Sequence, residues 1–347
     1  MNQIELVILT GFLGAGKTTL LGTFLKDTEA NETALLVNEV AQLDFDGAIL
    51  KASTTVPVTL LSNGCICCSV GTDLAQSVGA LMEACATTGR PLKRIVLETS
   101  GLARPGPLLR SLASFGDLLR VSIVCAVDCS QAERMIGHRE AIEQLAAANR
   151  IVLTKLDIAS YEQLQEVMRA VTEINPLASI VQETDEHKRA LGALAPVADI
   201  DGVRPSVSTV AARTIALEPT ALARDIRSRV CVFEEALESD VILEWIDNLA
   251  ASLGSRLLRL KGILRIAGSE RPIIVQSVGT FFSPVTYAPQ PSDLSFLVVI
   301  GVDLSIDDLT GNEPGISFSM EAMGGVGRYA NRQTPPTWSG ARHSPAH

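Results

Sequence analysis

Short apolar runs rich in Val, Ile and Leu recur through the first half of the chain, and stretches with the 3.6-residue apolar period of helices separate several of them. Near-continuous apolar strands that alternate with helices are typical of a parallel sheet covered by helices on both faces. We therefore expect an α/β fold with a mostly parallel, doubly wound sheet, in which ligands bind at the carboxyl ends of the strands. The predicted strands are 4–9, 34–37, 58–61, 95–97, 121–127, 151–153 and 179–181, and the predicted helices include 19–26, 73–85, 132–147 and 161–174.

The pattern changes after residue 184, so the first domain is expected to span 1–184. A charge run, three prolines and scattered Ser and Thr predict a linker or irregular segment at 185–229. Apolar periodicity returns in 230–323 and predicts a smaller α+β domain. The segment 324–347 has few large apolar residues, which predicts a disordered tail.

Local signals give the order of elements in the predicted C-terminal domain. Asp240 precedes an apolar helical face and is the expected N-cap of a helix. The pair Gly268-Ser269 lies between two strand-like runs and predicts a hairpin turn. The predicted strands of this domain are 257–266, 273–278 and 296–302.

Composition narrows the class of protein. The 347 residues are 47% hydrophobic and carry a formal net charge of −10, so we expect a sizeable core and no basic face for nucleic acid. The first residues lack the positive cluster of a signal peptide, and no apolar run reaches the roughly 18 uncharged residues of a membrane helix. We therefore expect a cytoplasmic protein with neither a nucleic-acid nor a membrane partner.

Residues 11–19 read Gly-Phe-Leu-Gly-Ala-Gly-Lys-Thr-Thr and lie between a predicted strand and a predicted helix. The glycines (Gly11, Gly14 and Gly16) let backbone N–H groups converge on one anion, and the following helix directs its positive end at the same anion. Lys17 supplies a charge for the β- and γ-phosphates, and Thr18 a hydroxyl ligand for Mg²⁺. A glycine-rich turn that binds nothing is the alternative, which the agreement of strand, loop, Lys-Thr pair and helix disfavours.

A second motif, Glu98-Thr99-Ser100-Gly101, follows the predicted strand 95–97. A carboxylate at the end of a strand beside the phosphate loop is where Mg²⁺ or its bound water is usually held, which is the role expected of Glu98. Gly101 allows the backbone to approach a γ-phosphate closely. An ordinary solvated carboxylate is the alternative for Glu98.

The segment Thr154-Lys155-Leu156-Asp157 follows the predicted strand 151–153 and resembles the guanine-specificity motif Asn-Lys-x-Asp of GTPases. The carboxylate of Asp157 would accept hydrogen bonds from N1–H and the 2-amino group of guanine, a pair of donors that adenine lacks. The stem of Lys155 would lie along the base. Thr154 departs from the usual asparagine.

Three cysteines, Cys65, Cys67 and Cys68, fall within four residues shortly after the predicted strand 58–61. Cys65 and Cys67 share one side of an extended segment, and a bend before the next helix allows Cys68 to join them. Three thiolates suit Zn²⁺, and to varying degrees Co²⁺ or Cu⁺; water, Glu39, a partner or a second copy could supply a fourth ligand. Redox chemistry and simple packing are the alternatives, and the other cysteines are expected to be structural.

Asn38-Glu39 follows the strand 34–37, in the position of a switch segment or of a polar surface loop.

The motifs described above, taken in order, resemble those of the CobW-type family of P-loop GTPases, relatives of the urease and hydrogenase nickel-insertion GTPases. They lie at residues 11–20, 38–39, 64–68, 98–101 and 154–157. Segments 257–264 and 295–301 resemble the C-terminal domain of that family. The resemblance covers about residues 4–304.

The resemblance implies GTP phosphates at residues 14–19, Ala15 and Thr19 included, and Mg²⁺ at Thr18 with Glu98 close by. It also implies guanine at Lys155 and Asp157, a transition metal at the three cysteines, and coupling of the two sites through the switch region. Two departures stand out: 40–42 lack the aromatic and glycine usual after Asn-Glu, and no His-rich stretch joins the domains.

The expected function is a GTP-dependent metallochaperone that binds Zn²⁺, with Co²⁺ as the alternative, and releases it to a client metalloprotein or metal-insertion enzyme when GTP is hydrolysed. The alternative is a GTPase subunit or activator for cobalt insertion in cobalamin biosynthesis or for a metal-containing hydratase. No arginine finger is evident, so slow intrinsic hydrolysis is expected, awaiting a client or a nucleotide-dependent homodimer. A small-molecule kinase is disfavoured because neither an acceptor site nor a lid is evident.

Overall fold

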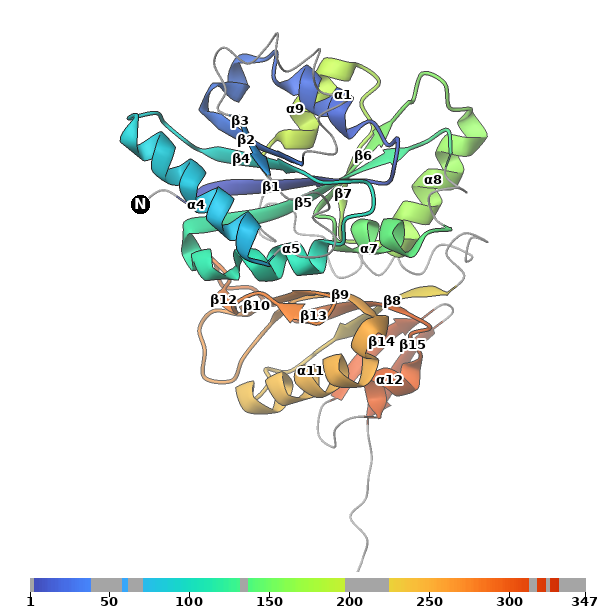
Figure 1. Ribbon diagram of the computed structural model, residues 1–347. Helices are drawn as coiled ribbons and strands as arrows, with labels where there is room; N and C mark the ends of the chain where they lie inside the picture. The colour runs from blue at the N-terminus through green and yellow to red at the C-terminus, as the bar shows by residue number, and fades with distance from the viewer. Residues whose placement is uncertain are drawn as a thin grey trace, which may run out of the picture.

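The computed structural model describes residues 3–38, 58–61, 71–131, 137–196, 225–311, 317–322 and 325–330, which form two layered domains (Figure 1). The N-terminal domain is built on a seven-stranded sheet of order β3-β2-β4-β1-β5-β6-β7, and every pairing in it is parallel. The predicted α/β fold with a parallel, doubly wound sheet is therefore confirmed. Its strands are β1 (Ile4–Thr10), β2 (Thr33–Asn38), β3 (Val58–Leu61), β4 (Arg94–Glu98), β5 (Leu119–Asp128), β6 (Arg150–Thr154) and β7 (Ser179–Val181).

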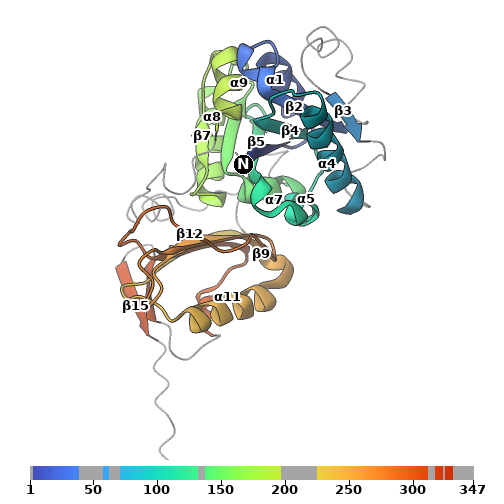
Figure 2. The same ribbon diagram turned by 90° about the vertical axis from the view of Figure 1, so that its left-hand side faces the viewer.

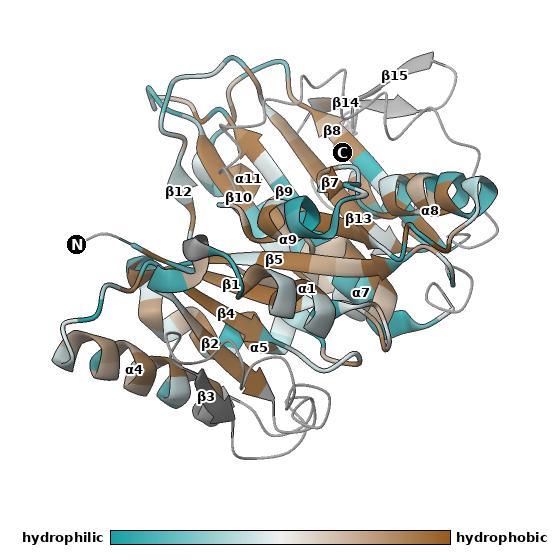
Figure 3. Cartoon of the chain, turned by 90° about the horizontal axis from the view of Figure 1, so that it is seen from above, coloured by the Kyte–Doolittle hydropathy of each residue, from teal (hydrophilic) through white to brown (hydrophobic). Residues whose placement is uncertain are grey.

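Helices cover both faces of this sheet. Along β1, Leu6 and Ile8 face helices α4, α5, α7 and α8, whereas Val7 and Leu9 face α1 and α9. Both faces are thus buried, which explains why the central strands are apolar along most of their length (Figure 3). The helices are α1 (Lys17–Phe24), α4 (Gly71–Thr87), α5 (Pro105–Leu112), α7 (Arg139–Ala147), α8 (Tyr161–Ile174) and α9 (Glu186–Leu194).

Two predictions for this domain are corrected. Helix α7 begins at Arg139, not at 132, because His138 is its extended N-cap; residues 132–136 lie outside the described residues. Helix α9 occupies part of the segment predicted to be a linker. Its N-cap Asp185 accepts from Lys188 N, and Ala190 and Leu194 pack on the α1 side of the sheet, so the charge run conceals a buried helical face.

The C-terminal domain is an antiparallel sheet with helices on one face. Its order is β11-β10-β9-β13-β8-β14-β15, with β12 paired to β10. Trp245 of α11 anchors the core between helix and sheet. The elements are β8 (Ile226–Val232), α11 (Ser239–Leu253), β9 (Leu257–Leu264), β10 (Ile273–Val278), β11 (Phe281–Phe282), β12 (Thr286–Tyr287), β13 (Phe296–Val302), α12 (Ile306–Thr310), β14 (Ser317–Ala322) and β15 (Gly325–Ala330).

Predictions for this domain were partly right. The hairpin at Gly268-Ser269 is confirmed, since β9 and β10 pair antiparallel and Gly268 has a φ of 76°. The N-cap prediction is wrong: Glu238 occupies the N-cap position of α11 without a capping hydrogen bond from its side chain to the described residues, and Asp240 lies in the first turn. The predicted disorder from residue 324 is also wrong for β15, because these residues pair with β14 along its length.

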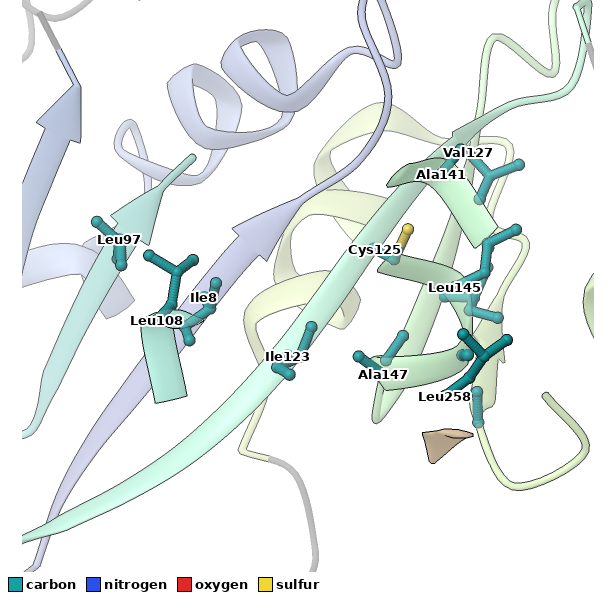
Figure 4. Packing of buried hydrophobic residues seen from close by; sticks show 14 of the residues in the cluster. Ile8, Leu97, Leu108, Ile123, Cys125, Val127, Ala141, Leu145, Ala147 and Leu258 are labelled. Atoms are coloured by element: carbon teal, nitrogen blue, oxygen red, sulfur yellow. The ribbon is translucent and has the colours of Figure 1, made fainter. Parts of the chain in front are cut away.

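The second face of the C-terminal sheet packs directly on the N-terminal domain (Figures 1 and 2). Leu258 of β9 belongs to the same buried cluster as Leu145 and Ala147 of α7, and Figure 4 shows these side chains beside one another. Arg139 Nη2 donates to Ser255 O at 3.0 Å at the rim of the same interface. One apolar core therefore joins the two domains.

Among the residues that the structure describes, no helix is both long and apolar enough to cross a membrane.

Candidate nucleotide-binding site

The phosphate loop joins β1 to α1 at the carboxyl edge of the parallel sheet. Gly14 and Gly16 have φ values of 78° and 82°, in the left-handed region that favours glycine. Gly16 is also the N-cap residue of α1, and no side chain of the described residues caps that helix. The free N–H groups of the first helical turn and the positive end of the helix dipole are thus available to an anion in the loop.

Lys17 lies over this loop. Its side chain is nearly buried, and Nζ donates to Gly11 O at 2.7 Å and to Phe12 O at 3.4 Å. Burial lowers the pKa of the Lys17 ammonium below its ordinary value, while the carboxylate of Glu98 opposes that shift. A phosphate in the loop would supply further negative charge and favour the protonated form.

Thr18 and Glu98 meet although they are distant in sequence. Glu98 ends β4, next to β1, and is only 1% exposed. Its Oε1 accepts a hydrogen bond from Thr18 Oγ1 at 2.9 Å. A hydroxyl and a carboxylate are hard oxygen ligands of the kind that Mg²⁺ prefers, so the donor set fits this ion.

Gly101 brings the chain that follows β4 against the phosphate loop. A Cβ at this position would lie 2.6 Å from Leu13 N, so only glycine fits without displacing the loop. Gln144 of α7, which is fully buried, donates from Nε2 to Gly101 O at 3.0 Å and to Ala103 O at 2.8 Å. The post-β4 segment is thus held between the phosphate loop and α7.

The Thr154–Asp157 segment borders the other side of the loop. Thr154 Oγ1 lies 2.9 Å from Ala15 O and 3.0 Å from Val127 O, so its hydroxyl ties the segment to the phosphate loop. Lys155 has a φ of 55°, which is rare for a residue with a side chain. Its Nζ donates to Asp128 Oδ2 at 2.7 Å, and Asp157 is exposed.

Asp128 and Gln144 contact the residues of this site, and the sequence analysis did not identify either of them as a site residue. Burial raises the pKa of Asp128, but hydrogen bonds from Lys155 and Ser130 outweigh burial, so its pKa lies below the ordinary value and the carboxylate stays charged beside Lys155. Asp128 ends β5, and a carboxylate at a strand's carboxyl end was a usable signal. Gln144 lies in mid-helix, and no sequence signal marks it.

The predicted transition-metal ligands, Cys65, Cys67, Cys68 and Glu39, lie outside the described residues. The strands that precede these residues in the chain, β2 and β3, are described. They pair in parallel, with Asn38 opposite Leu61. In the rest of the structure, as far as it is described, no three His, Cys, Asp or Glu residues are grouped as a metal site. Four cysteines there are buried and free, and burial raises the pKa of three of them to about 12: Cys125, Cys129 and Cys231.

The parallel sheet, the glycine loop with Lys17, and the Thr18–Glu98 pair define a P-loop nucleotide-binding protein. Residues 5–182 match the family model described as CobW/HypB/UreG, nucleotide-binding domain, and residues 226–311 match the cobalamin synthesis protein cobW C-terminal domain. The chain belongs to the CobW/HypB/UreG family. The resemblance predicted from its motifs is thereby confirmed.

Relatives extend over most of the chain. It is 28% identical over 317 residues to the zinc chaperone YjiA of Escherichia coli (strain K12), which covers 89% of this chain and 97% of that protein. It is 34% identical over 199 residues to zinc-regulated GTPase metalloprotein activator 1 of Schizosaccharomyces pombe, covering 53% of this chain and 46% of that protein. A crystal structure of a Zn(II)-bound triple mutant of the YjiA GTPase matches with a TM-score of 0.62 at 25% identity, over 89% of this chain and 97% of the other.

Proposed function

We propose that this protein is a GTP-dependent metallochaperone that carries Zn²⁺ and releases it to a client metalloprotein when GTP is hydrolysed. Its family membership supports the nucleotide-binding activity. The names of its relatives, a zinc chaperone and a zinc-regulated GTPase metalloprotein activator, support GTP hydrolysis and zinc as the cargo. Co²⁺ suits the same thiolates and is the alternative cargo.

The proposed nucleotide-binding residues belong to the phosphate loop and to the segments beside it. Backbone N–H groups from Gly14 to Thr19 surround the phosphates, and Lys17 neutralises their charge. Thr18 and Glu98 would hold Mg²⁺, which would supply positive charge to offset the charge of the phosphates during hydrolysis. At the other end, Asp157 accepts from guanine, while Lys155, held by Asp128, lies along the base.

One observation favours coupling between metal and nucleotide: three neighbouring strands deliver the relevant segments to one edge of the sheet. Asn38 of β2 is opposite Leu61 of β3, and Val37 of β2 is opposite Glu98 of β4. The segment with Glu39 therefore leaves the sheet between the strand that precedes the cysteines and the strand that carries Glu98.

The proposed cycle uses this arrangement. With GTP and Mg²⁺ bound, the segment after β2 would become ordered, and Cys65, Cys67 and Cys68 would close on the metal, with Glu39 as the proposed fourth ligand. Hydrolysis removes the γ-phosphate and relaxes the segment, so the metal passes to the client. Linkage requires that Zn²⁺ then raise the affinity for GTP by the same factor. A nucleotide-dependent homodimer and a cytoplasmic location stay predictions.

A competition titration tests the proposal. Zn²⁺ and Co²⁺ are titrated against a chelator of known affinity under reducing conditions, with Mg²⁺-GTP, with Mg²⁺-GDP and without nucleotide. Wild type should bind Zn²⁺ at least about tenfold more tightly with GTP than with GDP, a coupling of about 1.4 kcal/mol. Cys67→Ser should lose this difference, whereas Cys85→Ser, at a buried cysteine of α4, should keep it. Equal zinc affinity in all three nucleotide states would refute the cycle.

A further inference from the structure

The buried amide of Gln144 is the contact of the nucleotide site that no motif explains. Gln144 is 0% exposed and lies on α7, on the side of the sheet that faces the C-terminal domain. Both hydrogen bonds from Nε2 reach carbonyls of the segment that follows Glu98, at Gly101 and Ala103. Because both neighbours are acceptors, only the NH₂ group can face them, and the orientation of the amide is fixed.

The other half of this amide is unsatisfied. Gln144 Oε1 is buried and has no hydrogen-bond partner among the described residues. A buried carbonyl oxygen without a donor costs stability, and an apolar side chain of similar length would avoid that cost. The glutamine differs from an apolar residue in that it donates two hydrogen bonds at the nucleotide site. These hydrogen bonds indicate a role for Gln144 beyond filling space.

Gly101 is the residue on which these contacts act. Without a side chain it has little intrinsic preference for one backbone conformation. On one side Leu13 of the phosphate loop leaves no room for a Cβ at Gly101, and on the other side Gln144 holds the Gly101 carbonyl. The path of the chain past the phosphates is therefore set by these two contacts, not by Gly101 itself.

We infer that Gln144 is a positioning residue that fixes the backbone at Gly101 where it meets the γ-phosphate. Gln144 does not touch the nucleotide; it acts through the carbonyls of Gly101 and Ala103. The inference rests on the proposed nucleotide-binding role of Gly101. It requires that Gln144 favour a nucleoside triphosphate over the diphosphate, since only the triphosphate has the phosphate that Gly101 meets.

Asn175 provides a matched control. Its buried amide Nδ2 also donates to carbonyls of α7 and of the residue beyond it, at Leu145, Ala146 and Ala148, but it lies away from the phosphate loop. Removing either amide takes hydrogen-bond donors away from backbone carbonyls of the same part of the fold. Only the loss of Gln144 should change the discrimination between nucleotides.

The test compares dissociation constants of Mg²⁺-GMPPNP and Mg²⁺-GDP for wild type, Gln144→Met and Asn175→Leu. Gln144→Met should raise the GMPPNP constant about tenfold and leave the GDP constant within about twofold, whereas Asn175→Leu should leave their ratio unchanged. An unchanged ratio in Gln144→Met, or equal weakening of both nucleotides, would overturn the inference.

Two further arms keep the result interpretable. If Gln144→Met does not fold, Gln144→Asn replaces it, because this substitution keeps the amide but shortens the side chain by one methylene. The ratio of the GMPPNP and GDP dissociation constants is then measured for Gln144→Asn. If wild type prefers adenine nucleotides, the proposed guanine specificity fails, and AMPPNP and ADP then test Gln144 in the same way. The two proposals can thus fail separately.

Discussion

At the scale of single residues, Thr154 shows how a departure from a motif can be accommodated. Its hydroxyl reaches Ala15 O in the phosphate loop and Val127 O at the end of β5. An asparagine, the usual residue of this motif, carries an amide donor where Thr154 carries a hydroxyl. The threonine is therefore a shorter side chain that still connects the base-binding and phosphate-binding segments, provided that its hydroxyl remains.

Thr154→Val tests this role. The substitution keeps the shape of the side chain and removes the single hydroxyl proton that the two carbonyls share, so we expect a loss of about 1 kcal/mol in the free energy of unfolding. Affinity for GDP and for a GTP analogue should fall together, because the connection serves both. Urea denaturation and isothermal titration calorimetry measure the two effects. Thr154→Ser should behave like wild type; if Thr154→Val does so too, the hydroxyl does not tie the segments.

At the scale of elements, the carboxyl-terminal end of α7 is held by the C-terminal domain. Arg259 of β9 is 3% exposed, and its Nη1 donates to Ala146 O at 3.0 Å and to Ala148 O at 2.7 Å. Burial lowers the pKa of Arg259 to about 10, so the guanidinium stays charged at neutral pH. A cation at this end of a helix also complements the helix dipole.

Arg259→Met is expected to destabilise the protein by about 2 kcal/mol. Two charge-assisted hydrogen bonds are lost, but removal of a buried charge offsets part of the loss, and Asn175 still donates to both carbonyls. Denaturant unfolding at neutral pH measures the change. The exposed Arg169 on α8 offers a control, since Arg169→Met should alter stability by less than about 0.5 kcal/mol. Equal effects of the two substitutions would contradict the docking role.

Helix α12 gives a prediction about pH. The hydrogen bond from Arg256 is the main cause that lowers the pKa of Asp308 to about 2; Nη2 and Oδ1 lie 2.6 Å apart. A lowered native pKa stabilises the fold above the unfolded pKa of about 3.9, and that contribution is lost as pH falls toward 2. For a pair this exposed it should amount to about 1 kcal/mol or less.

The melting temperature of wild type should thus exceed that of Asp308→Asn by a constant margin between pH 5 and 7, and the margin should shrink below about pH 4. Scanning calorimetry across this range measures the difference. Asp117→Asn, at a residue that forms no ion pair with any other described residue, serves as the control and should show no such trend. A margin that grows on acidification would contradict the assignment.

At the scale of the whole molecule, the sequence predicts a feature well when the residues that form it are close together in the chain. The phosphate loop was found because Lys17 and Thr18 follow the glycines at a fixed spacing. The helix after Asp185 was missed, because a charge run at its start resembles a solvated linker while its buried face is spread over a longer stretch.

Contacts between segments that are distant in the chain could not be predicted from the sequence. Gln144 approaches Gly101 across 43 positions, and Arg259 reaches Ala146 across 113, so no sequence pattern could pair them. The cysteine motif is local, and it stays a prediction because it lies outside the described residues.

The shared core between the domains implies that they unfold together. Leu258 of β9 is 4% exposed and packs in one cluster with residues of α5, α7 and α8. Separating the domains would expose that apolar surface to water, which is unfavourable. Any ligand that stabilises the N-terminal domain should therefore also protect the C-terminal domain, although the predicted nucleotide contacts all belong to the N-terminal domain.

Scanning calorimetry with and without Mg²⁺-GDP tests this coupling. Wild type should show one transition, and GDP at about 100 times its dissociation constant should stabilise it by about 2.7 kcal/mol, or roughly 4 °C for a chain of this length that unfolds as one unit. Leu258→Asp places a carboxylate in the shared core, so the transition should split, and GDP should shift only the part that reports the N-terminal domain. Leu243→Asp, the same change at an exposed position of α11, should leave one transition. Two transitions in wild type, with only one shifted by GDP, would mean that the nucleotide state does not reach the C-terminal domain through the core.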